Sequence, residues 1–99
     1  MNPETFRRKV ASRVRKARWR LGLTQEEAAV QAGVTMRYLA EIERGRRNPT
    51  IGVLFDIARI MKLAVADFVD VGDAPRVALD ELNLHPPPRG RKPRPKRRR

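Results

Sequence analysis

The side chains of this sequence that could do chemistry are mainly cations. The 99 residues include 23 Lys and Arg, 11 Asp and Glu, no Cys and one histidine, His85. Catalysis needs a constellation of groups, and no nucleophile, metal-ligand cluster or phosphate-binding loop accompanies that histidine. We therefore expect no enzyme activity, no cofactor and no metal site. The net charge of +12 predicts a polyanionic partner, with nucleic acid as the first candidate and an anionic membrane as the second.

The charge is spread unevenly along the chain. Residues 86–99 hold eight cationic residues and no acidic one, whereas residues 1–85 have a net charge of +4. Eight basic residues lie between Arg7 and Arg20, and the stretch from Leu63 to His85 is acidic. This polarity favours a cationic binding surface at one end of the molecule. Charge that serves only solubility is the alternative.

Two apolar stripes predict the helices that flank the centre of the chain. The first stripe comprises Phe6, Val10, Val14, Ala17 and Leu21. The second comprises Ile51, Leu54, Ile57, Ala58 and Met61. Such spacings put each set on the inner face of a helix, the first ending near Gly22 and the second capped by Thr50. A short fifth helix is expected near residues 65–69.

Capping residues delimit two short helices between these stripes. Thr24 and Glu27 stand three residues apart as a capping box, which starts a helix. Gly33 ends that helix by supplying the left-handed conformation of a sharp exit. Thr35 caps the next helix, which we expect to run to about Arg44.

The run GLTQEEAAVQAGVTMRYLAEIERGRRNPTIGVLFDIARIMKL resembles the helix-turn-helix proteins of the phage lambda repressor and Cro type, the XRE family. In its unit from Gln25 to Arg44, Ala29 must be small because two helices cross there, and Gly33 makes the turn. The residues that seal the wedge are Ala28, Ala32, Val34, Leu39 and Ile42. The resemblance extends from Val10 to Phe68 and implies an all-α, compact four- to five-helix DNA-binding domain. An αα-corner with a purely structural role is the alternative.

The resemblance also implies which residues contact DNA. The recognition helix, residues 35–44, would enter the major groove, so base edges would meet Thr35, Met36, Arg37 and Glu41. Arg37 would bind guanine through two hydrogen bonds, Glu41 would accept from a cytosine amino group, and Met36 would touch a thymine methyl. Phosphates would be bound by Gln25, Arg44, Arg46, Arg47 and Asn48. Arginines that are merely solvated are the alternative for this loop.

Two charged residues are expected to stabilise the fold rather than to bind DNA. Arg18 and Glu43 match the positions of a structural ion pair in the XRE family. The resemblance therefore implies a clamp between the first and third helices.

Composition divides the chain into three parts. Residues 1–72 are the expected helix-turn-helix domain, and residues 73–85 are an arm or a segment for a dimer or partner contact. Residues 86–99 are expected to form a disordered Pro/Arg-rich tail. The segment Pro88–Pro93 is similar to an AT-hook, except that Lys92 precedes the proline. The expected DNA contacts of the tail are Arg89, Arg91, Lys92 and Arg94, either in the minor groove or by plain phosphate attraction.

These features predict a sequence-specific transcriptional regulator, a repressor, that binds double-stranded DNA as a homodimer in the cytoplasm. The alternative is an antitoxin-type module that binds operator DNA and also holds a toxin through residues 65–84. RNA binding by the tail is a third hypothesis, but the aromatic residues are not grouped as a stacking platform. No apolar run approaches the length of a membrane span, and membrane insertion is not expected.

Overall fold

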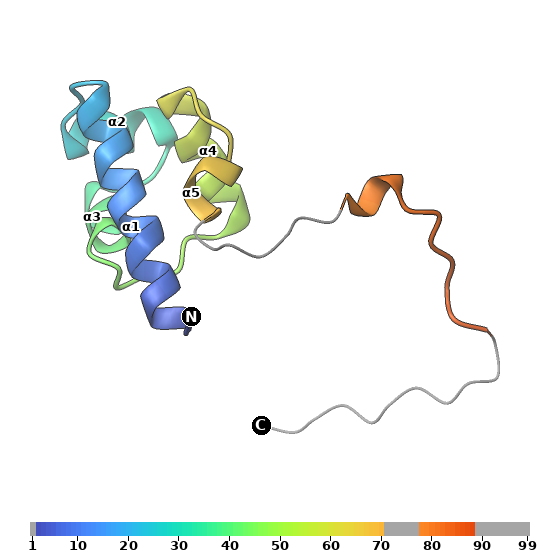
Figure 1. Cartoon of the computed structure of the whole chain (residues 1–99). Helices are drawn as coiled ribbons and strands as arrows, with labels where there is room; N and C mark the ends of the chain where they lie inside the picture. Colours follow the sequence, from blue (N-terminus) through green and yellow to red (C-terminus); the bar gives the residue numbers. More distant parts are fainter. Residues whose placement is uncertain (1, 71–77, 89–99) are drawn as a thin grey trace.

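The computed structural model describes residues 2–70 and 78–88, and helices are the only regular elements there (Figure 1). The elements are α1 Pro3–Arg20, α2 Gln25–Ala32, α3 Met36–Glu43, α4 Ile51–Met61, α5 Ala66–Val69 and a 3-10 turn, η1, Leu79–Glu81. The expected all-α fold of four to five helices is confirmed. The expected boundary between residues 72 and 73 lies outside the described residues, as do the expected tail disorder over 89–99 and the tail contacts Arg89, Arg91, Lys92 and Arg94.

The predicted caps set the helix ends. At the start of α2, Thr24 Oγ1 accepts from the Glu27 N–H at 3.0 Å and Glu27 Oε1 accepts from the Thr24 N–H at 2.9 Å. Gly33 ends α2 with φ of 73°. Thr35 and Thr50 cap α3 and α4 by accepting from backbone N–H groups three residues later. Each of these caps was predicted from the sequence and is confirmed.

The hydrophobic core lies between α1 and the other helices of the domain. α1 packs against α3, α4 and α5, while α2 packs against α3 and α4. The fully buried side chains that join these helices include Val14, Leu39, Ile42, Ile57, Met61 and Phe68. Burial of this apolar surface is the main force that holds α3 in place.

Three residues of the predicted inner stripes are solvent-exposed, so these assignments were wrong. Ile51 is 84% exposed, Phe6 39% and Leu21 37%. Ile51 lies in the first turn of α4, and helical side chains lean toward the N-terminus, so there is little structure beside it to pack on. Phe6, in the first turn of α1, lies at the edge of a pocket that Val69 also lines, and this pocket does not enclose it. Leu21 follows the last residue of α1 as its C-cap and no longer continues the helical stripe.

The described part of the arm, residues 78–85, carries the apolar residues that were expected beyond the domain. Its turn η1 is held by local hydrogen bonds, such as the Glu81 N–H to the Ala78 carbonyl at 3.0 Å. Leu79, Leu82 and Leu84 are exposed. The role of the arm as a dimer or partner segment stays a prediction.

Candidate nucleic-acid interface

The turn between α2 and α3 presents one side of α3 to solvent. Ala29 is 2% exposed at the α2–α3 crossing, and its carbonyl accepts from the Val34 N–H at 3.0 Å. Leu39 and Ile42 bury the inner side of α3, which leaves the outer side open. The structure exposes Thr35, Met36 and Arg37 there and half-buries Glu41. The four predicted base-contact residues thus lie on or beside one short helix.

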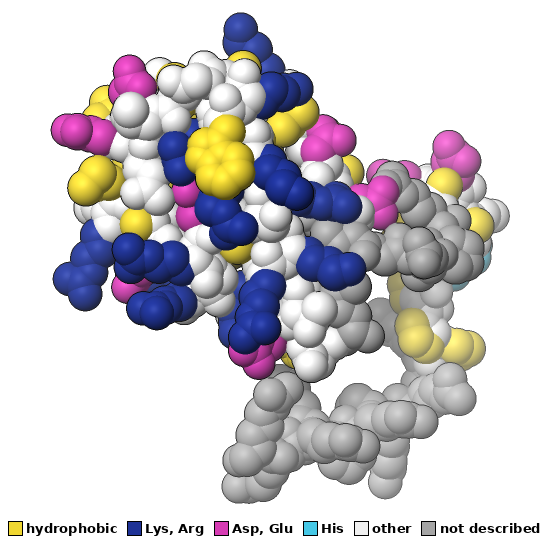
Figure 2. Space-filling model, turned by 60° about the vertical axis from the view of Figure 1, so that its left-hand side comes forward, with side chains coloured by type: hydrophobic (Ala, Val, Ile, Leu, Met, Phe, Trp, Pro, Cys, Tyr) yellow, Lys and Arg dark blue, Asp and Glu magenta, His cyan; other side chains and the backbone are white. Residues whose placement is uncertain are grey.

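Several arginines near this outer side of α3 have no hydrogen-bond or ion-pair partner within the described residues. Among residues 2–70 and 78–88, the guanidinium groups of Arg37, Arg44 and Arg46 make no hydrogen bond and no ion pair, and all three side chains are exposed. Figure 2 shows Lys and Arg side chains spread over one face of the helical body, with fewer acidic ones between them. Unpaired guanidiniums beside an exposed helix are suited to phosphate oxygens.

Arg18 and Glu43 form the expected clamp between α1 and α3. Arg18 Nε and Nη2 donate to the two Glu43 carboxylate oxygens at 2.8 and 2.9 Å, and the Glu43 residue is only 2% exposed. The hydrogen bonds from Arg18 to Glu43 are the main cause that raises the pKa of Arg18 above its usual value. Because the pair is bidentate and largely buried, it holds the C-terminal end of α3 against α1.

Gln25 belongs to this clamp as well, which the sequence did not indicate. Its Nε2 donates to Glu43 Oε1 at 3.1 Å. A phosphate contact was predicted for Gln25, and that contact stays a prediction. One amide hydrogen is engaged with Glu43, which leaves the other hydrogen and the N-terminus of α2 for an anion.

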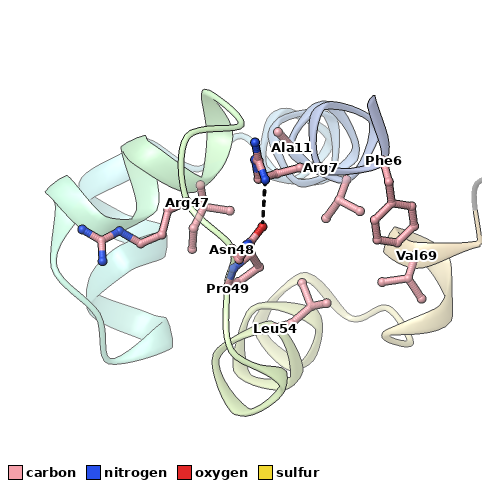
Figure 3. A pocket seen from close by; sticks show the side chains of 10 residues that line it. Phe6, Arg7, Ala11, Arg47, Asn48, Pro49, Leu54 and Val69 are labelled. Carbon is pink, nitrogen blue, oxygen red and sulfur yellow. Dashed lines mark hydrogen bonds between the residues drawn. The ribbon is translucent and has the colours of Figure 1, made fainter. Parts of the chain in front are cut away.

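The loop that follows α3 is anchored to α1. Gly45 has φ of 72°, and a Cβ on it would lie 3.4 Å from Arg8 Cγ, so the chain passes close to α1. Arg7 Nε donates to the Gly45 carbonyl at 2.7 Å, and Arg7 Nη1 donates to Asn48 Oδ1 at 3.3 Å. Figure 3 shows Arg7 and Asn48 facing each other beside a small pocket of about 230 Å³ lined also by Phe6 and Val69. The amide oxygen of Asn48 is therefore used within the fold, and its NH₂ group remains for the predicted phosphate contact.

Arg47 makes contacts that the sequence did not predict. Its Nε and Nη2 both donate to Glu41 Oε1, at 3.0 and 2.8 Å. Its guanidinium carbon lies 5.1 Å from the centre of the Tyr38 ring. The hydrogen bond with Arg47 is the main cause that lowers the pKa of Glu41, and the charges of Arg37 and Arg44 act in the same direction. Glu41, which was predicted to contact a base, and Arg47, which was predicted to contact a phosphate, are thus hydrogen-bonded to each other.

The arginines of α1 make contacts within the fold, although the basic run from Arg7 to Arg20 was predicted to contribute to a cationic binding surface. Arg20 donates to the Met61 carbonyl at 2.8 Å, and Arg15 donates to the Glu43 carbonyl. Arg13 donates to the carbonyls of Asp67 and Asp70 at 3.0 and 2.7 Å. These acceptors lie at the C-terminal ends of α3, α4 and α5, where helices leave carbonyls unsatisfied and carry a partial negative charge. α1 therefore presents fewer free cations than its composition indicates.

Residues 14–68 match the helix-turn-helix family HTH_3. The chain belongs to this helix-turn-helix family. The chain is similar to the HTH-type transcriptional regulator y4dJ of Sinorhizobium fredii, 37% identical over 68 residues, which are 69% of this chain and 88% of that protein. The transcriptional regulator ClgR of Mycobacterium tuberculosis is 35% identical over 79 residues, 79% of this chain and 69% of that protein. DNA-binding regulation of transcription is the activity class of this helix-turn-helix family.

Solved structures support the assignment of this chain to the helix-turn-helix family. The clp gene regulator ClgR of Corynebacterium glutamicum superposes with a TM-score of 0.63 at 29% identity, over 66% of this chain and 69% of that one. The restriction-modification controller protein C.AhdI of Aeromonas hydrophila superposes with a TM-score of 0.61 at 27% identity, over 63% of this chain and 94% of that one. The lambda repressor and Cro type of fold predicted from the sequence is confirmed.

Among the described residues, no three His, Asp or Glu side chains gather where they could hold a metal ion. No helix in residues 2–70 and 78–88 combines the length and the apolar character that crossing a membrane requires.

Proposed function

We propose that the chain is a sequence-specific repressor that binds double-stranded DNA through α3 in the major groove. The observation that carries this proposal is the exposed side of α3, with unpaired Arg37 on the helix and unpaired Arg44 and Arg46 beyond its end. Arg37 on the helix suits the guanine edge, whereas arginines in the loop suit phosphates. Occupation of the DNA by the helical body would block other proteins from the same site.

Two arginine variants test this assignment. Arg37→Ala should cost about 1 to 3 kcal/mol at one operator position and relax base preference there, because a two-bond guanine contact is worth that much. Arg46→Ala should weaken binding to all sequences alike and reduce the slope of log affinity against log salt by about 1. Binding is measured on an operator selected from random DNA, with scrambled DNA beside it.

Arg59→Ala is the matched control, because Arg59 is an exposed arginine on α4 whose ion pair with Asp56, at 3.6 Å, lies on α4 itself. This variant should leave both base preference and salt slope unchanged. Equal losses for Arg37→Ala and Arg46→Ala on specific and scrambled DNA would contradict the assignment of α3 as the reading helix.

The protein acts as a dimer on a two-fold symmetric operator in this proposal. A single short reading helix covers too few base pairs to select a site, and two copies place half-sites about 34 Å apart. The exposed arm leucines Leu79 and Leu82 are candidates for the contact between copies or with a toxin-like partner. Leu79→Asp with Leu82→Asp should lower the dimer fraction in light scattering, whereas retention of dimers would exclude the arm from the interface.

The tail adds phosphate affinity in this proposal. Truncation after His85 removes eight cations, so affinity should fall strongly at low salt and little at high salt, with the half-site unchanged. An AT-hook role for Arg89 and Arg91 makes a further demand, since the guanine amino group obstructs the minor-groove floor. Operators with A·T or G·C flanks distinguish the two roles, because plain phosphate attraction loses equally on both.

A further inference from the structure

The contact between Glu41 and Arg47 leaves half of the Glu41 carboxylate open. Both Arg47 donors, Nε and Nη2, converge on Glu41 Oε1 at 3.0 and 2.8 Å. Within the described residues, no hydrogen bond reaches Glu41 Oε2. A guanidinium pairing with a carboxylate often engages both oxygens, as Arg18 does with Glu43. The one-sided geometry of Arg47 instead holds the carboxylate and keeps one acceptor free.

Arg47 is itself held in place. Its guanidinium stacks on the ring of Tyr38, which lies one helical turn before Glu41 on α3. The Glu41 side chain is 26% exposed and that of Arg47 is 52% exposed. In Figure 3, Arg47 points away from the pocket that its loop lines, whereas Arg7 and Asn48 point toward each other. The three side chains Tyr38, Glu41 and Arg47 therefore form a unit on the reading side of α3.

Electrostatic repulsion explains why a carboxylate on a DNA-binding surface needs a paired cation. A bare carboxylate near the phosphates would be repelled, but a directly bonded guanidinium cancels most of that charge locally. Arg47 also lowers the pKa of Glu41 through its hydrogen bond, which favours the ionised form of the carboxyl. An ionised carboxylate only accepts hydrogen bonds, and the amino group of cytosine is the donor that it matches in the major groove.

We propose that Arg47 is a positioning residue that fixes Glu41 as a hydrogen-bond acceptor for the amino group of a cytosine, rather than a free phosphate contact. The proposal rests on the proposed function, because it assumes that α3 reads the major groove. It assigns the specificity at one operator position to a residue of the loop that lies outside the reading helix. It also separates Arg47 from its neighbour Arg46, although both were predicted to bind phosphates.

The test compares Arg47→Met, Arg47→Lys, Glu41→Ala and Arg46→Met in the full chain. Methionine keeps an apolar stem beside the loop pocket and removes the guanidinium, so the fold is preserved. Each protein is titrated with operators that carry each of the four bases at every half-site position, at several salt concentrations. Glu41→Ala identifies the position at which cytosine is preferred.

Arg47→Met should lower the preference for cytosine at that position about five- to tenfold, with no change in salt slope. Arg47→Lys should restore only part of the preference, because an ammonium cannot place two parallel donors on one oxygen. Adding Arg47→Met to Glu41→Ala should have no further effect on base preference, because the two residues act as one unit. In the free protein, the NMR titration of the Glu41 carboxyl should shift to higher pH in Arg47→Met.

A drop in salt slope of about 1 for Arg47→Met, equal to that of Arg46→Met and without a change in base preference, would overturn the proposal. An unchanged base preference in Glu41→Ala would also overturn it. In both cases, a specific loss in Arg37→Ala would show that the proposed function still stands. If Arg37→Ala and Glu41→Ala both leave every base preference unchanged, the proposed function fails together with the inference.

Discussion

The arginines of α1 and those on and just after α3 are the same residue type but differ in their surroundings. Five arginines of α1, Arg7, Arg13, Arg15, Arg18 and Arg20, donate to backbone carbonyls outside α1. Arg37, Arg44 and Arg46 make no hydrogen bond or ion pair within the part of the chain that the structure describes. The first set stabilises the fold by linking its parts, and the second set remains available to bind a ligand.

This difference shows that net charge overstates the surface that can bind DNA. A guanidinium carries five donors, so one arginine can satisfy carbonyls at the ends of neighbouring helices while its charge opposes their partial negative charge. The basic run from Arg7 to Arg20 therefore contributes to stability as well as to the electrostatic field. The two sets of arginines should respond differently to substitution, and the following expectations test that difference.

The largest effect is expected at the clamp. Arg18→Ala should lower the free energy of unfolding by about 3 to 5 kcal/mol, because the Glu43 carboxylate would remain buried without its bidentate partner. The double variant Arg18→Met with Glu43→Leu should be less destabilised, since no charge is stranded. Chemical denaturation of the full chain measures both. A double variant that loses as much stability as Arg18→Met and Glu43→Leu measured separately and added together would show that the pair is not coupled.

A smaller loss is expected when α5 is released from α1. Arg13→Met removes the hydrogen bonds to the carbonyls of Asp67 and Asp70 and should cost about 1 to 2 kcal/mol, with no change in the salt slope of DNA binding. Arg8→Met is the matched control, because among the described residues Arg8 pairs only with exposed Glu4, and the free energy of unfolding should change by less than about 0.5 kcal/mol. If Arg13→Met lowers the salt slope by about 1, α1 also binds phosphates and the comparison fails.

Arg44 should show the opposite response. Arg44→Met should change the free energy of unfolding by less than about 0.5 kcal/mol, because the guanidinium has no hydrogen bond within residues 2–70 and 78–88. The salt slope should fall by about 1 if Arg44 neutralises one phosphate. Thermal or chemical unfolding and DNA titration on the same preparation measure the two effects. Destabilisation without a change in slope would place Arg44 with the arginines of α1.

The smallest effect concerns two exposed carboxylates. Hydrogen bonds from Thr24 lower the pKa of Glu27, and the hydrogen bond from Arg47 lowers the pKa of Glu41, each from an ordinary value of 4.5. A lowered folded-state pKa adds stability above the unfolded value, and this stability is lost as the pH falls through the folded pKa. Unfolding free energies measured below about pH 4.5 should therefore fall less steeply in Glu27→Gln and Glu41→Gln than in the parent chain. Identical slopes would show that neither contact is formed in solution.

The sequence by itself determined the helices of the reading unit. The capping box of Thr24 and Glu27, the turn at Gly33 and the caps at Thr35 and Thr50 are confirmed because each depends on residues at most a few positions apart. Local hydrogen bonds and backbone conformation decide such features, and neighbouring residue types reveal them. The buried stripes were predicted in the same way, except where a first turn or a C-cap left a residue exposed.

Only the tertiary structure decided which charged groups face each other. Arg13 meets the Asp70 carbonyl across 57 residues of sequence, and Gln25 meets Glu43 across 18. The link between Glu41 and Arg47 spans only six residues, yet it depends on how the loop leaves α3 and returns over Tyr38. A long, flexible arginine side chain can reach partners well outside its own sequence neighbourhood. The packing of the helices chooses the partner, because it determines which unsatisfied carbonyls and carboxylates come within reach.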